Sequence, residues 1–426
     1  MAHEDAAPED RAATEAAPVG LGRITRVRLK NYKSIVSCDV ELQPLTILVG
    51  PNGSGKSNFL DALAFVSEAL TLGLEQAIRT RGNLDRILSA ARPPGEDSFT
   101  IELGFDLGEA GPGRYRFVIE RAPGGGFMVS RERFDLICAQ DTLGQDLYWI
   151  RENGATKWSS DGPLEVHSFG DTGRLFLMTY GGNPNARAAY DLLTRMVFYS
   201  PLPGAMRDLK RRDVVPHLRS GGANAASMLQ QMQHADPDLV WRITQYMSRV
   251  LPGLEKIQVD DLAGRDLLRV SLASEGEAAP RWFDADQLSD GTLRALAILV
   301  ALFQHRLGGK SATSLVGIEE PENNLHPATG GAFANALIDA AYDGQVLVTT
   351  HSMSLLDGEE IDASCLRAVV MENGVTQIGP VDKVSRSLLR EHLYTAGELL
   401  QQNQMHPELD GDVSEPSVGE PAPAGR

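Results

Sequence analysis

Apolar and polar residues alternate near the start of the chain, and this pattern then changes to a helical spacing. From Ile24 to Leu29 the apolar residues are separated by arginine and threonine, which is typical of a half-buried strand. Residues 36–42 and 46–49 continue the strand-like pattern. Residues 56–72 are predicted to form a helix, because large apolar side chains recur on one face every three or four positions.

The pattern between residues 74 and 280 differs from that of both flanking regions. Short strand-like runs are separated by turns rich in glycine and proline, and a long helical stretch is also present. The strand-like runs are 99–107, 115–120, 127–136, 257–261 and 267–273, and the helical stretch is 225–251. These features predict an antiparallel β-section followed by a helical subdomain, with the last two runs forming a hairpin.

Two runs of continuous apolar residues alternate with helical patterns toward the C-terminus. The runs at 315–318 and 346–349 are typical of buried strands, and helices are predicted over 293–303 and 329–341. Strands that are apolar on both faces and separated by helices favour a parallel sheet covered on both sides. The predicted fold class is α/β, with a mixed sheet, an antiparallel β-section and an inserted helical subdomain.

Both ends of the chain are rich in alanine, proline and acidic residues. Residues 1–20 and 401–426 show no apolar periodicity, so we expect two disordered tails. The domain between the tails is expected to be assembled from two separated segments, 21–73 and 281–400. Residues 74–280 are then the inserted β and helical region.

The composition is that of a soluble globular protein, with 42% hydrophobic and 23% charged residues. The longest apolar stretch, Ala295–Phe303, is far shorter than the roughly 20 residues of a membrane span, and the N-terminus lacks the pattern of a signal peptide. Cys38, Cys138 and Cys365 are far apart in sequence and are expected to be ordinary thiols of a reducing compartment. We therefore expect a cytoplasmic protein without a membrane partner.

The net charge of −17 bears on nucleic-acid binding. This charge argues against a uniformly basic surface for nucleic acid, although it is compatible with a local basic patch. The run Arg207–Arg212 could contact a nucleic-acid backbone, or it could be a solvated face with neighbouring acids. The same two interpretations apply to Arg79, Arg81 and Arg86.

A glycine-rich segment, Gly50–Ser57, reads Gly-Pro-Asn-Gly-Ser-Gly-Lys-Ser and matches the phosphate-loop pattern in full. It follows a predicted strand and opens a predicted helix, which is the context that this pattern requires. Glycines let backbone N–H groups turn toward phosphates, and the helix N-terminus adds its dipole. Lys56 is expected to bind the β- and γ-phosphates of ATP, and Ser57 is expected to ligate Mg²⁺. The candidate nucleotide-binding residues here are Asn52, Gly53, Ser54, Gly55, Lys56, Ser57 and Asn58.

Two carboxylates follow the buried strand at 315–318. At a strand end beside a phosphate loop, one carboxylate can hold the metal and the other can deprotonate the attacking water. We assign Glu319 to Mg²⁺ and Glu320 to the catalytic base. Alone, the pair could also be an acidic turn before Pro321, and the phosphate loop in the same chain favours the catalytic interpretation.

Two further places could meet a triphosphate, although neither is specific in isolation. Ser289 and the backbone of Gly291 precede a predicted helix and could contact a γ-phosphate, or they could form a plain helix cap with a glycine turn. His351 lies just past the strand at 346–349 and could form a hydrogen bond near the γ-phosphate, or it could be a loop histidine without a role.

These four pieces together resemble the ATP-binding-cassette ATPases. The phosphate loop resembles their Walker A, residues 288–292 their signature, residues 315–320 their Walker B and His351 their switch histidine, in the family's order along the chain. The entry segment Asn31-Tyr-Lys-Ser34 and the acidic segment Glu319–Pro327 are similar to those of the RecF, SMC and overcoming-lysogenisation-defect ATPases.

The resemblance implies a homodimer in which each ATP is sandwiched between two subunits. Lys33 would lie near the bound nucleotide, and residues 323–326 would face the partner subunit. One subunit would supply Lys56, Ser57, Glu319, Glu320 and His351, and the other would supply Ser289 and Gly291.

The sequence departs from the transporter members of this family. The Walker B strand ends in Glu-Glu where transporters usually have Asp-Glu, and the signature reads Leu-Ser-Asp-Gly-Thr in place of Leu-Ser-Gly-Gly-Gln. Gln76 and Gln140 are both candidates for the glutamine loop. No C-terminal segment resembles the metal-binding nuclease domain that some relatives carry.

The resemblance implies an ATPase that acts as a nucleotide-dependent dimerising switch. DNA repair or anti-phage defence would be its setting, with an effector partner such as a nuclease or a toxin. Two alternatives stay open: an energy-coupling subunit of an ABC transporter, and a non-catalytic binding module in which ATP only fixes a conformation. The entry segment, the altered signature and the long insert argue against the transporter, and steady-state phosphate release would separate the module from the enzyme.

Overall fold

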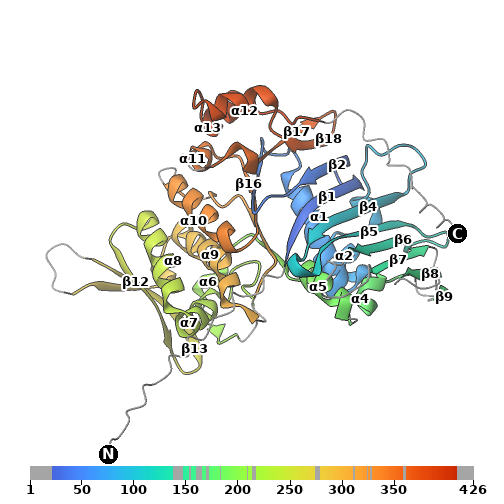
Figure 1. The fold of residues 1–426 in the computed structure, drawn as a ribbon. Coiled ribbons are helices and arrows are strands. Elements are labelled where there is room, and N and C mark those ends of the chain that lie inside the picture. The colour runs from blue at the N-terminus through green and yellow to red at the C-terminus, as the bar shows by residue number, and fades with distance from the viewer. Residues whose placement is uncertain are drawn as a thin grey trace, which may run out of the picture.

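In the computed structural model the chain forms three sheets with helices packed against them (Figure 1). The residues that the structure describes are 22–137, 147–152, 155–159, 166–168, 172–182, 184–208, 210–213, 217–273, 279–309, 312–323, 325–326, 329–357 and 361–409. The N-terminal tail expected over 1–20 lies outside these ranges, as do Cys138, Gln140 and residues 410–426.

A six-stranded sheet forms the centre of the fold, in the order β10-β15-β16-β3-β17-β18. Its first five strands are parallel, and β18 pairs antiparallel with β17 at one edge. The strands are β3 (Leu45–Val49), β10 (Met196–Tyr199), β15 (Leu315–Glu319), β16 (Val346–Thr350), β17 (Leu366–Glu372) and β18 (Val375–Pro380). The parallel pairing expected from the continuous apolar runs is therefore confirmed.

Each face of this sheet packs against its own apolar cluster. Leu48 of β3 belongs to the cluster that contains α1 (Lys56–Thr71). Its neighbour Ile47 belongs to the cluster that contains α9 (Asp290–Phe303) and α10 (Gly330–Asp343), because successive strand residues point to opposite faces. Helices therefore cover both faces, which explains why every residue of β3 and β16 is buried.

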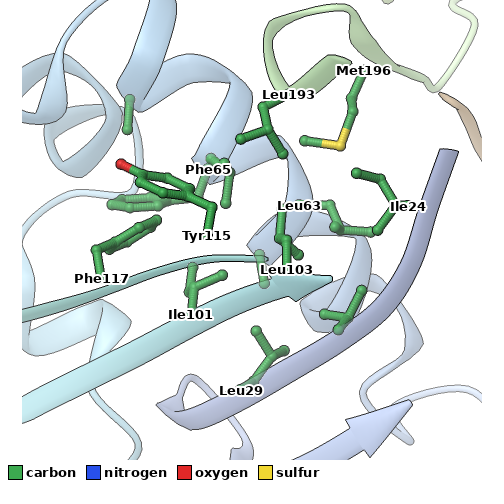
Figure 2. Packing of buried hydrophobic residues seen from close by; sticks show 14 of the residues in the cluster. Ile24, Leu29, Leu63, Phe65, Ile101, Leu103, Tyr115, Phe117, Leu193 and Met196 are labelled. Atoms are coloured by element: carbon green, nitrogen blue, oxygen red, sulfur yellow. The ribbon is translucent and has the colours of Figure 1, made fainter. Parts of the chain in front are cut away.

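An antiparallel sheet of eight strands packs on α1, in the order β2-β1-β4-β5-β6-β7-β8-β9. Figure 2 shows Leu63 and Phe65 of α1 among side chains of this sheet, including Ile101 and Phe117. The ring centroids of Phe65 and Phe99 are 5.5 Å apart in an edge-to-face arrangement. The strands are β1 (Arg23–Tyr32), β2 (Ile35–Glu41), β4 (Ser98–Asp106), β5 (Pro112–Arg121), β6 (Phe127–Leu136), β7 (Leu147–Glu152), β8 (Ala155–Ser159) and β9 (Val166–Ser168).

The outer face of the eight-stranded sheet carries cross-strand ion pairs. Arg28 lies between Asp39 and Glu102, with a guanidinium nitrogen 2.8 Å from each carboxylate. Arg114 extends this row to Asp135, at 3.3 Å. Because acids alternate with these arginines, the face is a network of paired charges and not a uniformly basic surface.

The helical subdomain consists of α7 (Ala225–Ala235) and α8 (Pro237–Val250) beside a small sheet. The sequence predicts one helix over 225–251, but Asp236 caps a second helix that has Pro237 at its first position. Tyr246 of α8 stacks on Phe303 of α9 with ring centroids 5.8 Å apart, which attaches the subdomain to the central sheet. The strands of the small sheet are β11 (Lys210–Arg211), β12 (Leu254–Asp261), β13 (Arg265–Leu272) and β14 (Arg281–Asp284), and β12 and β13 form the predicted hairpin.

Residues 74–280, expected as an inserted β and helical region, pair through their backbone with both flanking segments. β4 pairs directly with β1, and β10 pairs in parallel with β15 at the edge of the central sheet. The physical reason is that both β1 and β15 have a second edge whose backbone groups need hydrogen-bonding partners. The β-section therefore completes sheets that begin in the flanking segments.

The C-terminal region packs on β18 further along the chain than the sequence predicts. A disordered tail is expected from residue 401, but Met405 is buried and Val381 pairs with Pro407. The N–H of Glu408 donates to the carbonyl of Pro380 at 2.8 Å.

The other described α-helices are α2 (Leu74–Thr80), α3 (Leu84–Ile87), α4 (Phe176–Tyr180), α5 (Pro184–Thr194), α6 (Pro203–Arg207), α11 (Met353–Leu356), α12 (Lys383–Arg390) and α13 (Ala396–Gln401).

A buried carboxylate, Glu132 of β6, joins the antiparallel sheet to α4. It accepts hydrogen bonds from the hydroxyl of Tyr115 at 2.7 Å and from the backbone N–H groups of Phe176 at 2.6 Å and Leu177 at 3.0 Å. Burial raises the pKa of Glu132, and these hydrogen bonds oppose the rise. The side chain thus satisfies donors at the start of α4 that would otherwise be buried without partners.

We expect Glu132→Ala to lower the free energy of unfolding by about 3 kcal/mol or more, because three buried donors lose their acceptor. Urea unfolding measures this loss. Glu255→Ala, which removes an exposed acid from β12, is the control and should change the free energy of unfolding by less than about 0.5 kcal/mol. Equal effects of the two substitutions would contradict the role given to Glu132.

Candidate nucleotide-binding site

The glycine-rich loop between β3 and α1 has a backbone that only glycine accommodates at several positions. Gly53 and Gly55 have φ angles of 78° and 103°, in the region that side chains disfavour. A Cβ at Gly50 would collide with the carbonyl of Val369, and a Cβ at Gly55 would collide with the hydroxyl of Thr376. The glycines of the sequence pattern are therefore explained by the local geometry.

A chain of side-chain hydrogen bonds holds this loop in place. The amide of Asn58 donates to the hydroxyl of Ser34 at 2.6 Å, and the hydroxyls of Ser34 and Thr376 are 2.6 Å apart. The hydroxyl of Thr376 then donates to the carbonyl of Ser54 at 2.9 Å. Ser34 ends the entry segment, so that segment supports the loop. The side chain of Asn58, expected to bind nucleotide, takes part in this support.

Lys56 lies at the start of α1 and is folded back onto the loop. Its ammonium donates to the carbonyls of Gly50 at 2.7 Å and Pro51 at 2.9 Å, and its exposed fraction is 5%. Burial lowers the pKa of Lys56, and the nearby charges of Glu320 and Glu322 oppose this. The lysine is thus preorganised at the loop, and the charges of Glu320 and Glu322, which are distant in sequence, act on it.

The remaining polar groups of the loop fit a phosphate chain with its metal. The buried hydroxyl of Ser54 has no hydrogen-bond partner within the described part of the chain. Asn52, Gly53 and Ser57 are exposed at the mouth of the loop, and Glu319 is half-buried at the end of β15. A serine hydroxyl and a carboxylate beside phosphates are ligands that suit Mg²⁺.

Lys33 does not extend into the loop. It lies in the turn between β1 and β2, where its φ is 50° and its ammonium forms an ion pair with Asp61 of α1 at 2.6 Å. Asp61 also pairs with Arg81 at 2.9 Å and accepts from the hydroxyl of Tyr32 at 2.7 Å. These contacts tie the entry segment to the side of α1, and the nucleotide contact expected for Lys33 stays a prediction.

The two acids predicted for catalysis lie at the carboxyl end of β15, next to the end of β16. Glu319 is opposite Thr349 in the parallel register, and the N–H of Glu320 donates to the carbonyl of Thr349 at 2.9 Å. Glu320 has a φ of 43°, an uncommon value for a residue with a side chain. Its carboxylate accepts from the amide of Asn323 at 2.6 Å and lies 3.3 Å from Nδ1 of His351. The structure therefore brings Glu320 and His351 together.

A third acid, Glu322, also belongs to the site. Its carboxylate accepts from the hydroxyl of Thr350 at 2.6 Å and from the N–H of His351 at 3.2 Å. The sequence analysis assigned no role to this residue. Its place two positions after Glu320, in a turn that begins with Pro321, is the signal that could have indicated it.

The signature segment begins α9 and is held by two arginines, Arg294 of the same helix and Arg207. Ser289 caps the helix, accepting from the N–H of Thr292 at 3.1 Å, and Gly291 lies in the first turn. Arg294, one turn further on, donates to the backbone carbonyls of Glu319 at 3.2 Å and Glu320 at 3.1 Å. This buried arginine links the signature helix to the two acids predicted for catalysis, and the sequence analysis did not identify it.

The basic run Arg207–Arg212 is engaged in intramolecular contacts at both ends. Arg207 donates to the carbonyl of Leu288 at 2.8 Å and pairs with Asp290, so it supports the signature segment. Arg212 pairs with Asp266 at 3.0 Å. These contacts favour the interpretation of a paired face over that of a nucleic-acid site.

The other arginines considered for nucleic acid, and the remaining glutamine candidate, lie along α2 and α3. Arg79 pairs with Glu75 at 2.7 Å, and Arg81 pairs with Glu68 at 2.6 Å as well as with Asp61. Arg86 lies in α3. Gln76 is exposed on α2, so the described contacts do not assign it to the nucleotide site.

Two protein families match the two parts of the chain that form the site. The family described as "AAA ATPase domain" matches residues 23–90, which include the glycine-rich loop. The family described as "AAA domain, putative AbiEii toxin, Type IV TA system" matches residues 229–357, which include the signature segment, the acids and His351.

Curated relatives match over long and short stretches. The Old nuclease of Escherichia phage P2 is 20% identical over 374 residues, which is 83% of this chain and 60% of that protein. The chromosome partition protein Smc of Methanocaldococcus jannaschii is 41% identical over 61 residues, 14% of this chain and 5% of Smc. The DNA replication and repair protein RecF of Paenarthrobacter aurescens is 29% identical over 94 residues, 21% of this chain and 24% of RecF. The chain thus spans less than two thirds of the length of each of these relatives.

Solved structures of Smc head domains share the fold. A head bound to the C-winged helix domain of ScpA has a TM-score of 0.52 at 15% identity, covering 84% of this chain and 96% of that chain. A head with an extended coiled coil, bound to the C-terminal domain of ScpA and derived from Pyrococcus furiosus, has a TM-score of 0.50 at 13% identity, covering 87% and 99%. The predicted ABC-type α/β head fold is confirmed. No helix among the described residues has the length and apolar character needed to cross a membrane.

We expect Gly55→Ala to destabilise the protein by about 2 kcal/mol more than Gly53→Ala, because only the Cβ at position 55 collides with a neighbour. Both alanines carry the cost of a positive φ, about 1 kcal/mol, so this term cancels in the comparison. Urea unfolding of the two nucleotide-free variants measures the difference. If both variants lost the same free energy of unfolding, the support of the loop by Thr376 would be refuted.

Proposed function

We propose that this chain, which belongs with the SMC- and RecF-like family of ABC-type ATPases, binds Mg²⁺–ATP at the glycine-rich loop and hydrolyses it. The observation that carries this proposal is the convergence of three groups on one edge of the central sheet. Burial lowers the pKa of Lys56, and the nearby negative charge of Glu320 opposes this change. The carboxylate of Glu320 in turn lies 3.3 Å from Nδ1 of His351. A binding module without catalysis has no need for a carboxylate and an imidazole at this place.

The residues of the loop and the strand ends have separate tasks in hydrolysis. Lys56 exchanges its contacts with loop carbonyls for the β- and γ-phosphates, and the hydroxyl of Ser57 and the carboxylate of Glu319 hold Mg²⁺. Held by these two residues, the metal would supply positive charge against the phosphates. The carboxylate of Glu320 accepts the proton of the attacking water, and the imidazole of His351 forms a hydrogen bond to the γ-phosphate.

We further propose that the site is completed by a second copy of the chain. Ser289 is exposed at the N-terminus of α9, where the hydroxyl and the helix dipole can meet a phosphate presented by another molecule. ATP then joins two copies, because its γ-phosphate is contacted from both sides. Hydrolysis removes these contacts and loosens the dimer.

The biological setting that we propose for this switch is DNA repair or anti-phage defence, with an effector protein as its partner. The similarity to the phage Old nuclease over most of this chain supports such a setting, as does the family described as a putative AbiEii toxin. A nuclease or a toxin is the kind of effector that would respond to the nucleotide state. The paired arginines of the described surface give no support for direct binding to nucleic acid.

We expect Glu320→Gln to bind ATP but to release phosphate at about a hundredth of the wild-type rate or below, because the proton acceptor is lost. The variant should persist as a nucleotide-bound dimer. Lys56→Ala should lose ATP binding. Binding of a fluorescent ATP analogue, steady-state phosphate release and size-exclusion chromatography with ATP measure these effects. Wild-type turnover by Glu320→Gln would rule out the assignment of the base.

Mixing two inactive variants tests the shared site. Lys56→Ala removes the lysine from one copy, and Ser289→Arg blocks the signature segment of the other. A mixed dimer contains one complete site, formed by Lys56 of the Ser289→Arg chain and Ser289 of the Lys56→Ala chain. We expect the mixture to regain a quarter of wild-type phosphate release, roughly, since about half of the dimers would be mixed and each would hold one of two sites. No recovery after exchange of the subunits would show that hydrolysis does not require a second copy.

A further inference from the structure

Glu322 contacts both residues at the end of β16. Its Oε1 atom accepts from the hydroxyl of Thr350 at 2.6 Å and from the N–H of His351 at 3.2 Å, and lies 3.8 Å from Nδ1 of the same histidine. The side chain of Glu322 is 11% exposed, so these contacts form away from bulk water. One carboxylate therefore meets the main chain and the ring of His351 at once.

A carboxylate at this position is costly and needs a compensating role. Its Oε2 atom is buried and has no hydrogen-bond partner among the residues that the structure describes. A buried charge with an unpaired oxygen is unfavourable unless other groups use it. A turn after a strand can be formed without any acid, so the turn itself does not explain Glu322.

The surroundings of His351 show what the carboxylate can do. Nδ1 of the ring lies 3.3 Å from Oε1 of Glu320 and 3.8 Å from Oε1 of Glu322, so two acids share one side of the imidazole. Nε2, the other ring nitrogen, has no hydrogen bond to any residue that the structure describes, so it is available to another ligand. The N–H of His351 is bound by Glu322 as well, which fixes the backbone from which the ring extends.

We propose that Glu322 is a positioning residue that holds His351 beside Glu320 with Nε2 available to the γ-phosphate. This inference rests on the proposed hydrolysis and adds to it a specific source of order. Thr350 shares the task, since its hydroxyl is the second donor that locks the carboxylate to the end of β16. Glu322 itself does not touch the reacting atoms in this arrangement, so its effect on turnover passes through His351.

Hydrogen exchange of the nucleotide-free full chain tests the contact directly. In Glu322→Ala, we expect the amide of His351 to exchange about tenfold faster or more, because it loses a charge-assisted acceptor. Glu322→Gln keeps an acceptor oxygen and should stay within about threefold of the wild type. Glu255→Gln, at an exposed acid of β12, is the matched control and should leave the amide unchanged. Unchanged exchange in Glu322→Ala would overturn the proposal.

Phosphate-release kinetics test the consequence for turnover. We expect Glu322→Ala to lower kcat about tenfold or more and to change KM for ATP by less than about threefold, because the hydrogen bonds that hold Lys56 to the loop do not involve Glu322. In a His351→Ala background, the same substitution should lower kcat by less than about twofold, since the residue acts through the histidine. A full tenfold loss in that background would contradict the proposal.

Two points keep the test decisive. If Glu322→Ala does not fold, Thr350→Val serves in its place, because it removes one of the two donors to the carboxylate and should also lower kcat more than it changes KM. If the wild type releases no phosphate, the proposed hydrolysis fails, and the exchange experiment still decides whether Glu322 holds His351. The two failures are therefore distinguishable.

Discussion

Three neighbouring parallel strands, β15, β16 and β3, have their carboxyl ends on the same side of the central sheet, and the candidate chemistry depends on their register. β16 pairs with β3 on one side and with β15 on the other, so Thr350 is opposite Val49 while its neighbour Thr349 is opposite Glu319. Main-chain hydrogen bonds continue past the strand ends, from Gly50 to Thr350 and from Glu320 to Thr349. Residues that are far apart in sequence thereby become neighbours, and a shift of one residue would move the acids away from the loop.

The loop is held just as firmly from its other side. The hydrogen bonds that run from Asn58 through Ser34 and Thr376 to the carbonyl of Ser54 join the entry segment, α1 and β18. A phosphate site depends on backbone N–H groups that are fixed before the ligand arrives, because the cost of ordering them would otherwise be subtracted from binding. This requirement explains why residues near the two ends of the chain meet around one short loop.

The sequence was sufficient for the features that local pattern determines. The glycine-rich loop, the buried strands β15 and β16 and the proximity of Glu320 to His351 follow from apolar runs and from the rule that parallel strands end together. The pairing of β4 with β1 and of β10 with β15 was not accessible, since long-range strand order leaves no local signal. The sequence did not indicate Arg294 or Glu322 for a related reason. Both residues act through contacts to main-chain groups that are distant in sequence, and such contacts leave no local pattern.

The charges around the strand ends limit what can bind there. The charges of Glu320 and Glu322 act on Lys56, and those of all three acids, Glu319 included, act on Arg294. Arg294 is already committed to the backbone carbonyls of Glu319 and Glu320. A triphosphate would add negative charge to a half-buried edge where one lysine and fixed amides cannot offset it. A divalent cation held by Glu319 would supply the missing positive charge, so the donor set fits the magnesium nucleotide that we propose better than a free one. The overall charge of −17 matters less, because screening over about 8 Å at physiological salt leaves the nearest groups to decide.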